Sequence, residues 1–146
     1  MEGESCLVDR WRTLLSSYNG VASHLERALQ ERHGLTLSEF ETLDRLAEAL
    51  DKPRMQELAA AMYLSQSALS RTVARLEKGG LVERIHCVAD RRGVVVELTE
   101  AGRLRHNEAR ATHLAVLAEH LNDMPARPTL SNEVSPQAAD TPVGSA

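Results

Sequence analysis

The stretch "SQSALSRTVARLEKGGLVER", residues 65–84, decides the fold of this 146-residue chain. Ser65 is a favourable helix N-cap, and Gly79–Gly80 ends the helix that begins after it. Between these limits apolar and β-branched side chains recur with helical spacing, at Leu69, Thr72, Val73 and Leu76. The pattern predicts an amphipathic helix that ends near Lys78, with one buried face and one polar face.

The polar face of this helix is unusual for an acidic chain. The formal net charge of the chain is -4, yet there is no Asp or Glu between Glu57 and Glu77. Residues 66–92 contain six basic and three acidic residues, which gives this segment a charge of +3. Local positive charge, rather than the charge of the whole chain, attracts phosphate. The absence of carboxylates therefore favours an anionic partner for this face.

The flanking sequence predicts further helices and a β-hairpin. Helical periodicity, a capping box at Thr36 and Glu39 and an N-cap at Thr99 indicate helices over residues 7–33, 36–50, 54–62 and 100–121. β-Branched residues indicate strands over residues 81–88 and 94–98, joined by the turn "ADRRG". Residues 1–6 are expected to be disordered. So is the tail 122–146, which holds four of the five prolines.

This order of elements predicts a mainly α fold with a small β-hairpin wing, the winged helix-turn-helix. The second helix of such a unit lies in the DNA major groove. Its predicted DNA-facing positions, with the N-cap, are Ser65, Gln66, Ser67, Ser70, Arg71 and Arg75. Gln pairs with adenine, Arg with guanine, and Ser with a base or a phosphate. Arg91 and Arg92 at the wing tip are placed to reach the minor groove. The alternative is a helix-turn-helix module that binds a protein and has little affinity for DNA.

Three blocks of sequence carry a resemblance to a known family. "LTLSEFETLDRLAE", "MQELAAAMYLSQSALSRTVARLEKGGLVER" and "DRRGVVVELTEAG" resemble the MarR (multiple antibiotic resistance regulator) family of bacterial transcription regulators. The resemblance implies a homodimeric repressor that binds a pseudo-palindromic DNA operator and is released by a small phenolic or other effector, or by oxidation. It implies dimerisation helices over residues 7–33 and 100–121, and a winged DNA-binding domain over residues 34–99. It also implies that Asp90 holds Arg92 in the minor groove, while Arg91 meets phosphate.

The resemblance further implies an effector pocket between the dimerisation helices and the winged domain. Trp11, Tyr18 and Phe40 are candidates for its lining, although core packing is the alternative for aromatic side chains at helical spacing. Family members usually end with one more helix, and the prolines of the tail do not permit one here. Either the dimer relies on the first and long helices alone, or it is weakened.

The cysteines and a row of histidines have structural as well as functional interpretations. Some relatives sense peroxides through a cysteine early in the first helix, but Cys6 precedes the predicted helix and Cys87 lies on a wing strand. His106, His113 and His120 form a line on the long helix. Spacing of seven residues separates their side chains by ~10 Å, too far for one zinc ion without other ligands. A solvated or interface-edge row is favoured, and no metal site is predicted.

Other classes of function are excluded by missing motifs. The chain has no nucleophile–base pair, phosphate-binding loop or paired carboxylates, so we expect neither an enzyme nor a bound cofactor. No apolar run approaches the ~20 residues that span a bilayer. The acidic start "MEGESCLVDR" is unlike a signal peptide. We therefore expect a cytoplasmic protein with no membrane partner, whose partner is double-stranded DNA.

Overall fold

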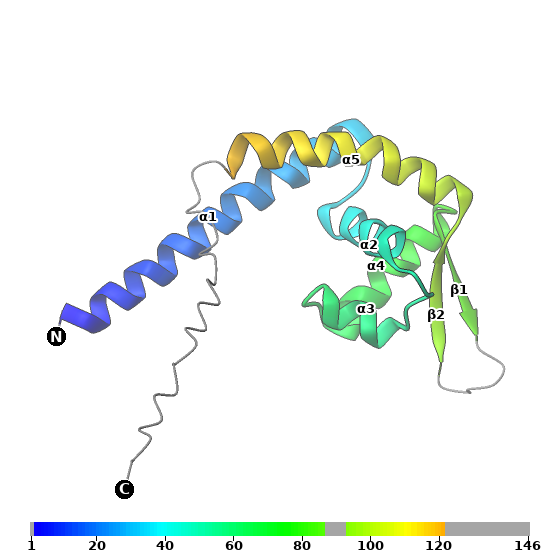
Figure 1. Ribbon diagram of the computed structural model, residues 1–146, viewed down its shortest axis with the longest axis horizontal. Coiled ribbons are helices and arrows are strands. Elements are labelled where there is room, and N and C mark those ends of the chain that lie inside the picture. The colour runs from blue at the N-terminus through cyan, green and yellow to red at the C-terminus, as the bar shows by residue number, and fades with distance from the viewer. Residues whose placement is uncertain (1, 87–92, 122–146) are drawn as a thin grey trace, which may run out of the picture.

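The computed structural model describes residues 2–86 and 93–121. Within these ranges the chain forms five helices and one two-stranded antiparallel sheet, so the predicted mainly α fold with a β-hairpin wing is confirmed. The elements are α1 (Glu2–His33), α2 (Leu37–Glu48), α3 (Met55–Ala61), α4 (Gln66–Lys78), β1 (Val82–His86), β2 (Val94–Leu98) and α5 (Glu100–His120). Helices α2–α4 and the hairpin form one unit; α5 runs along the top of it, and α1 extends away from it to one side (Figure 1).

The core of this unit forms where α2, α3, α4 and the hairpin meet. Phe40 and Leu43 on α2 are completely buried, and Leu58 at the centre of α3 is also buried. The four inward positions predicted for α4 are also buried, namely Leu69, Thr72, Val73 and Leu76. Each fully buried apolar side chain contributes about 1.5–3 kcal/mol relative to exposure. Burial therefore fixes which face of α4 remains on the surface.

Side-chain caps begin three of the helices at the predicted residues. Each N-cap hydroxyl accepts a hydrogen bond from the backbone N–H three residues later: Thr36 from Glu39 (3.1 Å), Ser65 from Ala68 (3.2 Å) and Thr99 from Gly102 (3.0 Å). Such a bond satisfies one of the amides that have no partner inside the helix. The caps fix where α2, α4 and α5 begin.

The turn between α3 and α4 sets the angle of the helix-turn-helix. Tyr63 has a φ of 56°, a left-handed conformation that is uncommon for a residue other than glycine. The backbone of Leu64 then donates to the carbonyl of Ala59 at 3.0 Å. The connection spans residues 62–65, so that α4 takes a new direction instead of continuing α3.

The hairpin is antiparallel and is held against the rest of the unit by its second strand. Its register pairs Val82 with Leu98 and His86 with Val94. On the other edge of β2, the amide of Val96 donates to the carbonyl of Pro53 at 3.1 Å. The wing therefore begins as an extension of the folded unit. The predicted turn residues 89–92 and Cys87 lie outside the described residues.

The N-terminus of the chain differs from the prediction. Residues 2–6 were expected to be disordered, but α1 begins at Glu2 and continues without interruption to His33. An acidic residue in the first turn of a helix interacts favourably with its macrodipole, and Glu4 occupies that turn. Cys6 is consequently inside the helix, as an exposed free thiol. The tail 122–146 lies outside the described residues.

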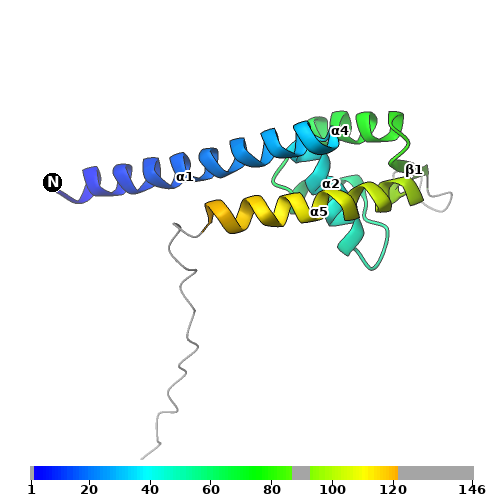
Figure 2. The same ribbon diagram turned by 90° about the horizontal axis from the view of Figure 1, so that it is seen from above.

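Helices α1 and α5 lie side by side and antiparallel near the C-terminal end of each (Figure 2). His33 Nε2 is hydrogen-bonded to Thr112 Oγ1 at 2.7 Å, and the rings of His24 and His120 stack with their centroids 3.9 Å apart. The N-terminal half of α1 extends beyond α5 (Figure 2). Among the described helices, none combines the length and apolar character needed to cross a membrane.

Candidate nucleic-acid interface

The outward face of α4 collects most of the predicted DNA-facing side chains. Gln66, Ser67, Arg71 and Arg75 are exposed, and Ser70 is half-buried. The first turn of α4 contains no acidic residue, so its free amides and positive dipole end are not neutralised. This face offers hydrogen-bond donors and positive charge, which are the groups that meet phosphates and base edges.

Ser65 has a structural task at the start of this face. Its hydroxyl caps α4 through Ala68 and lies 3.2 Å from the hydroxyl of Ser67. The side chain is therefore engaged by the helix itself. Ser65 positions the first turn of α4, while Gln66 and Ser67 present their side chains to solvent.

Arg75 is connected to α2 in this structure. Its Nε lies 3.6 Å from Glu39 Oε1, and its Nη2 lies 3.5 Å from Thr72 Oγ1. The Glu39 side chain is only 14% exposed, whereas that of Arg75 is 56% exposed. The sequence assigned Glu39 to a reciprocal capping box with Thr36, but its carboxylate reaches the arginine instead. A half-buried carboxylate thus lies beside a surface arginine at the end of the candidate interface.

Sequence reasoning missed the part played by Arg84. Its Nη2 donates to the backbone carbonyl of Ser70 at 2.8 Å, and its amide donates to Glu77 Oε2 at 3.1 Å. Its Nε is buried without a hydrogen-bond partner among the described residues. The alternation of the strand contained a signal, because Arg84 shares a face with the buried Val82. Arg84 therefore joins the wing to α4.

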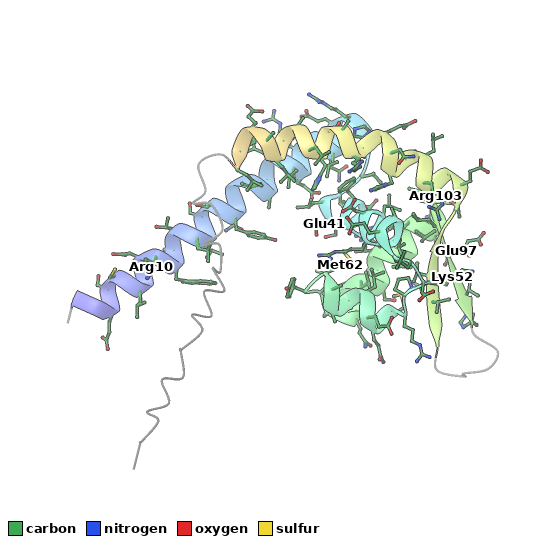
Figure 3. All side chains as sticks on the ribbon, viewed as in Figure 1. Arg10, Glu41, Lys52, Met62, Glu97 and Arg103 are labelled. Carbon is green, nitrogen blue, oxygen red and sulfur yellow. The ribbon has the colours of Figure 1, made fainter. Side chains whose placement is uncertain are left out.

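A second contact fixes the wing from the opposite strand. Lys52 Nζ lies 3.1 Å from Glu97 Oε2, linking the loop before α3 to β2 (Figure 3). Both side chains are substantially exposed, so the pair contributes little to stability. The predicted wing-tip residues Asp90, Arg91 and Arg92 lie outside the described residues.

A separate hollow opens between α1, α2 and the end of α5. It has a volume of about 580 Å³, and its lining includes Trp11, Tyr18, Leu25, Leu37, Glu41 and Leu117. Trp11 and Tyr18 thus line a cavity in the predicted region. Phe40 does not, because it is fully buried behind that wall, where its ring packs against His106 and His113 at centroid distances of 5.6 and 4.5 Å.

The sequence favoured a solvated or interface-edge row of histidines on α5, but in the structure these side chains pack against α1 and α2 of the same chain. His106 is 7% exposed, and its Nε2 is hydrogen-bonded to Asp44 Oδ1 at 2.7 Å. Burial lowers the pKa of the His113 imidazole, an effect that Asp44 opposes and His106 reinforces. No group of three metal-ligating side chains is present in the described residues. The row connects α5 to α1 and α2.

Comparison with known proteins assigns the chain to a family. Residues 33–93 match the MarR family. AbsC, a MarR family transcriptional regulator from Streptomyces coelicolor, is 36% identical, with a TM-score of 0.75 and coverage of 86% of this chain and 83% of AbsC. Sco3205 from the same organism, a MarR family regulator solved in complex with DNA, is 33% identical, with a TM-score of 0.75 and coverage of 84% and 77%.

Of two further relatives, one is solved with a small molecule and the other is described as a repressor. CouR from Rhodococcus jostii RHA1, solved bound to p-coumaroyl-CoA, is 30% identical, with a TM-score of 0.69 and coverage of 82% of this chain and 83% of CouR. The HTH-type transcriptional repressor MdtR from Bacillus subtilis (strain 168) is 29% identical over 92 residues. That match covers 63% of this chain and 59% of MdtR. The chain belongs to the MarR family, a group of winged-helix regulators rather than enzymes, as the sequence predicted.

Proposed function

We propose that this protein is a cytoplasmic transcription repressor that binds a pseudo-palindromic DNA operator as a homodimer. The observation that carries the proposal is the outward face of α4, where Gln66, Ser67, Arg71 and Arg75 are exposed and the first turn is free of carboxylates. Sco3205, with the same fold, is solved with DNA, and MdtR is described as a repressor. In the proposed complex α4 lies in the major groove, and the wing residues Asp90, Arg91 and Arg92 act at the minor groove.

The homodimer is supported by apolar surface on α1 and α5. The apolar stripe of α5 faces away from the chain's own core: Leu104 is 61% exposed and Leu114 is 50% exposed. The inward positions of the same helix are instead Gly102, His106, Ala109 and Thr112. Near the N-terminus of α1, Leu7 and Val8 are also exposed. Large apolar side chains exposed on both helices are typical of a protein–protein interface, and a second copy is the proposed partner.

Release of the DNA by a small molecule is the remaining part of the proposal. The hollow lined by Trp11 and Tyr18 lies where α1 and α5 meet the winged unit. A ligand seated there would alter the angle between the dimerisation helices and α4, and so the separation of the two half-sites. CouR, solved with p-coumaroyl-CoA, is a relative that binds a small molecule.

The alternative is a winged-helix module that binds a protein and has little affinity for DNA. The two functions are separated by DNase I footprinting on the DNA upstream of the protein's own gene, in the presence of competitor DNA. A repressor dimer is expected to protect two half-sites about one helical turn, ~34 Å, apart. Arg92→Ala is expected to weaken this protection severely and leave the fold intact. If the unmodified protein protects no DNA, the proposal is contradicted. If Arg92→Ala protects the DNA as well as the unmodified protein does, the assignment of the wing to the minor groove is contradicted.

A further inference from the structure

The connection between α1 and α2 is short and closely held. It consists of residues 34–36, because α1 ends at His33 and α2 begins at Leu37. Gly34 has a φ of 64°, the left-handed conformation in which many helices end. Leu35 is 1% exposed and belongs to the hydrophobic core. The chain therefore has little freedom at the point where α1 leads into the winged unit.

Glu26 on α1 binds the start of the helix that follows this connection. Its Oε2 accepts a hydrogen bond from the backbone amide of Leu37 at 2.8 Å. Leu37 is the first residue of α2, so this amide has no acceptor within its own helix. The Glu26 side chain is half-buried, and its negative charge lies at the positive end of the α2 dipole. A charge-assisted hydrogen bond thus joins α1 to the winged unit.

Arg105 on α5 makes a corresponding contact at the end of α1. Its Nη1 donates to the backbone carbonyl of His33 at 2.9 Å. His33 is the last residue of α1, where carbonyls lack partners within the helix and a cation is favourable. The side chain of His33 is also bonded to α5, through Thr112 Oγ1 at 2.7 Å. With the bond of Glu26, these contacts tie the end of α1 and the start of α2 to one another and to α5.

We propose that Glu26 and Arg105 are positioning residues that set the spacing of the two DNA half-sites which the dimer binds. The inference rests on the proposed function, because it requires two copies of α4 on one operator. The exposed apolar side chains of the proposed dimer lie on α1 and α5, whereas the DNA-facing side chains lie on α4. The junction of α1, α2 and α5 lies between these two surfaces (Figure 1). A change of angle at this junction moves the two copies of α4 relative to each other, because dimer symmetry repeats the change in the second copy.

The test measures how strongly DNA binding depends on the spacing of the half-sites. The probes are the operator found by footprinting, the same DNA with one base pair inserted or removed at its centre, and a single half-site. One base pair changes the separation of the half-sites by about 3.4 Å and rotates one of them about the DNA axis. The unmodified dimer is expected to bind the altered operators about tenfold or more weakly than the native one, because protein or DNA must deform to bridge them.

Two variants remove the contacts and keep much of the side-chain volume, namely Glu26→Met and Arg105→Met. Both are expected to bind the native operator more weakly and to lose the preference for its spacing, while they bind the single half-site as the unmodified protein does. Glu26→Gln is the matched control on α1, because it loses the charge but keeps an acceptor oxygen for the Leu37 amide, and it is expected to keep the preference. Arg110→Met removes the same charge as Arg105→Met from an exposed position on α5 and is also expected to keep it.

Hydrogen exchange without DNA gives a second readout. The Leu37 amide is expected to exchange faster in Glu26→Met than in the unmodified chain or in Glu26→Gln. All comparisons are made at a temperature where light scattering gives the same dimer mass for every variant. A spacing preference retained by both Met variants at positions 26 and 105, or an equal loss of affinity for the operator and the single half-site, would overturn the inference and leave the regulator intact. Absence of DNA binding by the unmodified protein would contradict the proposed function and this inference with it.

Discussion

The guanidinium of Arg84 on β1 donates to the backbone carbonyl of Ser70 on α4 at 2.8 Å. This bond joins the strand that leads into the wing to the middle of the candidate recognition helix. In the proposed complex these two elements enter neighbouring grooves, so their relative position decides whether both can bind at once. We therefore expect Arg84 to act as a positioning residue that affects DNA binding through the wing.

Replacing Arg84 is expected to uncouple the wing from α4. Arg84→Ala removes a charge-assisted hydrogen bond worth about 1.5–3 kcal/mol, so the denaturation midpoint should fall. Arg84→Lys keeps the charge but lacks the planar group that reaches Ser70. If Arg84 acts by position, the lysine variant should lose DNA affinity at a temperature where it remains folded. Full affinity in Arg84→Lys would show that only charge matters.

The ion pair of Arg75 with Glu39 leads to a second prediction. The carboxylate lowers the positive potential of the candidate interface and competes with phosphate for the arginine. Glu39→Gln is therefore expected to strengthen DNA binding modestly, while Arg75→Ala should weaken it by about 1–3 kcal/mol. Anisotropy of labelled operator DNA measures both. Arg27→Ala is the control, because Arg27 forms an exposed ion pair with Glu31 on α1, and it should leave affinity unchanged.

Gly102 explains why the motif "TEAG" ends in glycine. A Cβ at Gly102 would overlap the backbone carbonyl oxygen of Leu81 and lie 3.1 Å from Leu98 Cδ2. Gly102→Ala is therefore expected to destabilise the fold by at least about 1–3 kcal/mol, as overpacking does. At Gly20, within α1, an added Cβ would meet no atom within 4 Å. Gly20→Ala should stabilise the chain by about 0.5–1 kcal/mol. Chemical denaturation measures the free energy of unfolding of both variants. Equal changes in the two variants would refute the close contact of Gly102 with Leu81.

His113 predicts a dependence of stability on pH. Burial lowers the pKa of this imidazole below its ordinary value of 6.5, so the folded state keeps the neutral form while the unfolded chain takes up a proton. The stability that the neutral His113 side chain gives the fold is complete above pH 6.5. It is lost as the pH falls through 6.5 toward the lower pKa of the folded state. The denaturation midpoint of His113→Gln should therefore vary less between about pH 7.5 and about pH 5.5. His86→Gln, an exposed control on β1, should behave like the unmodified chain.

The sequence predicted those parts of the fold that depend on local signals. Ser65, Thr36 and Thr99 cap helices because their hydroxyls reach an amide three residues away, and such a bond can be read from a few adjacent letters. The helical spacing of apolar and β-branched residues predicted the buried face of α4. The order of the elements predicted the winged unit but left its function open between a DNA-binding and a protein-binding module. The family resemblance favoured DNA binding.

The errors concern side chains whose environment is built by distant residues. His106 is buried because Asp44, 62 residues away, accepts its hydrogen bond, and nothing near His106 in the sequence indicates that partner. Phe40 could be assigned to a pocket or to the core only once α5 was placed against α2. Arg84 entered only the charge of residues 66–92, because its partner, the backbone carbonyl of Ser70, lies on another element.

The central claim is that α4 and the wing bind DNA through phosphate and base contacts as a dimer. The most direct measurement is anisotropy of labelled upstream DNA across a salt series, with light scattering on the same sample. The account predicts binding by a dimer that resists competitor, with log K falling linearly with log salt by about 0.9 for each phosphate neutralised. Arg71→Ala should reduce that slope by about one if Arg71 contacts phosphate. Binding that is insensitive to salt, or that is lost to competitor, would contradict the account.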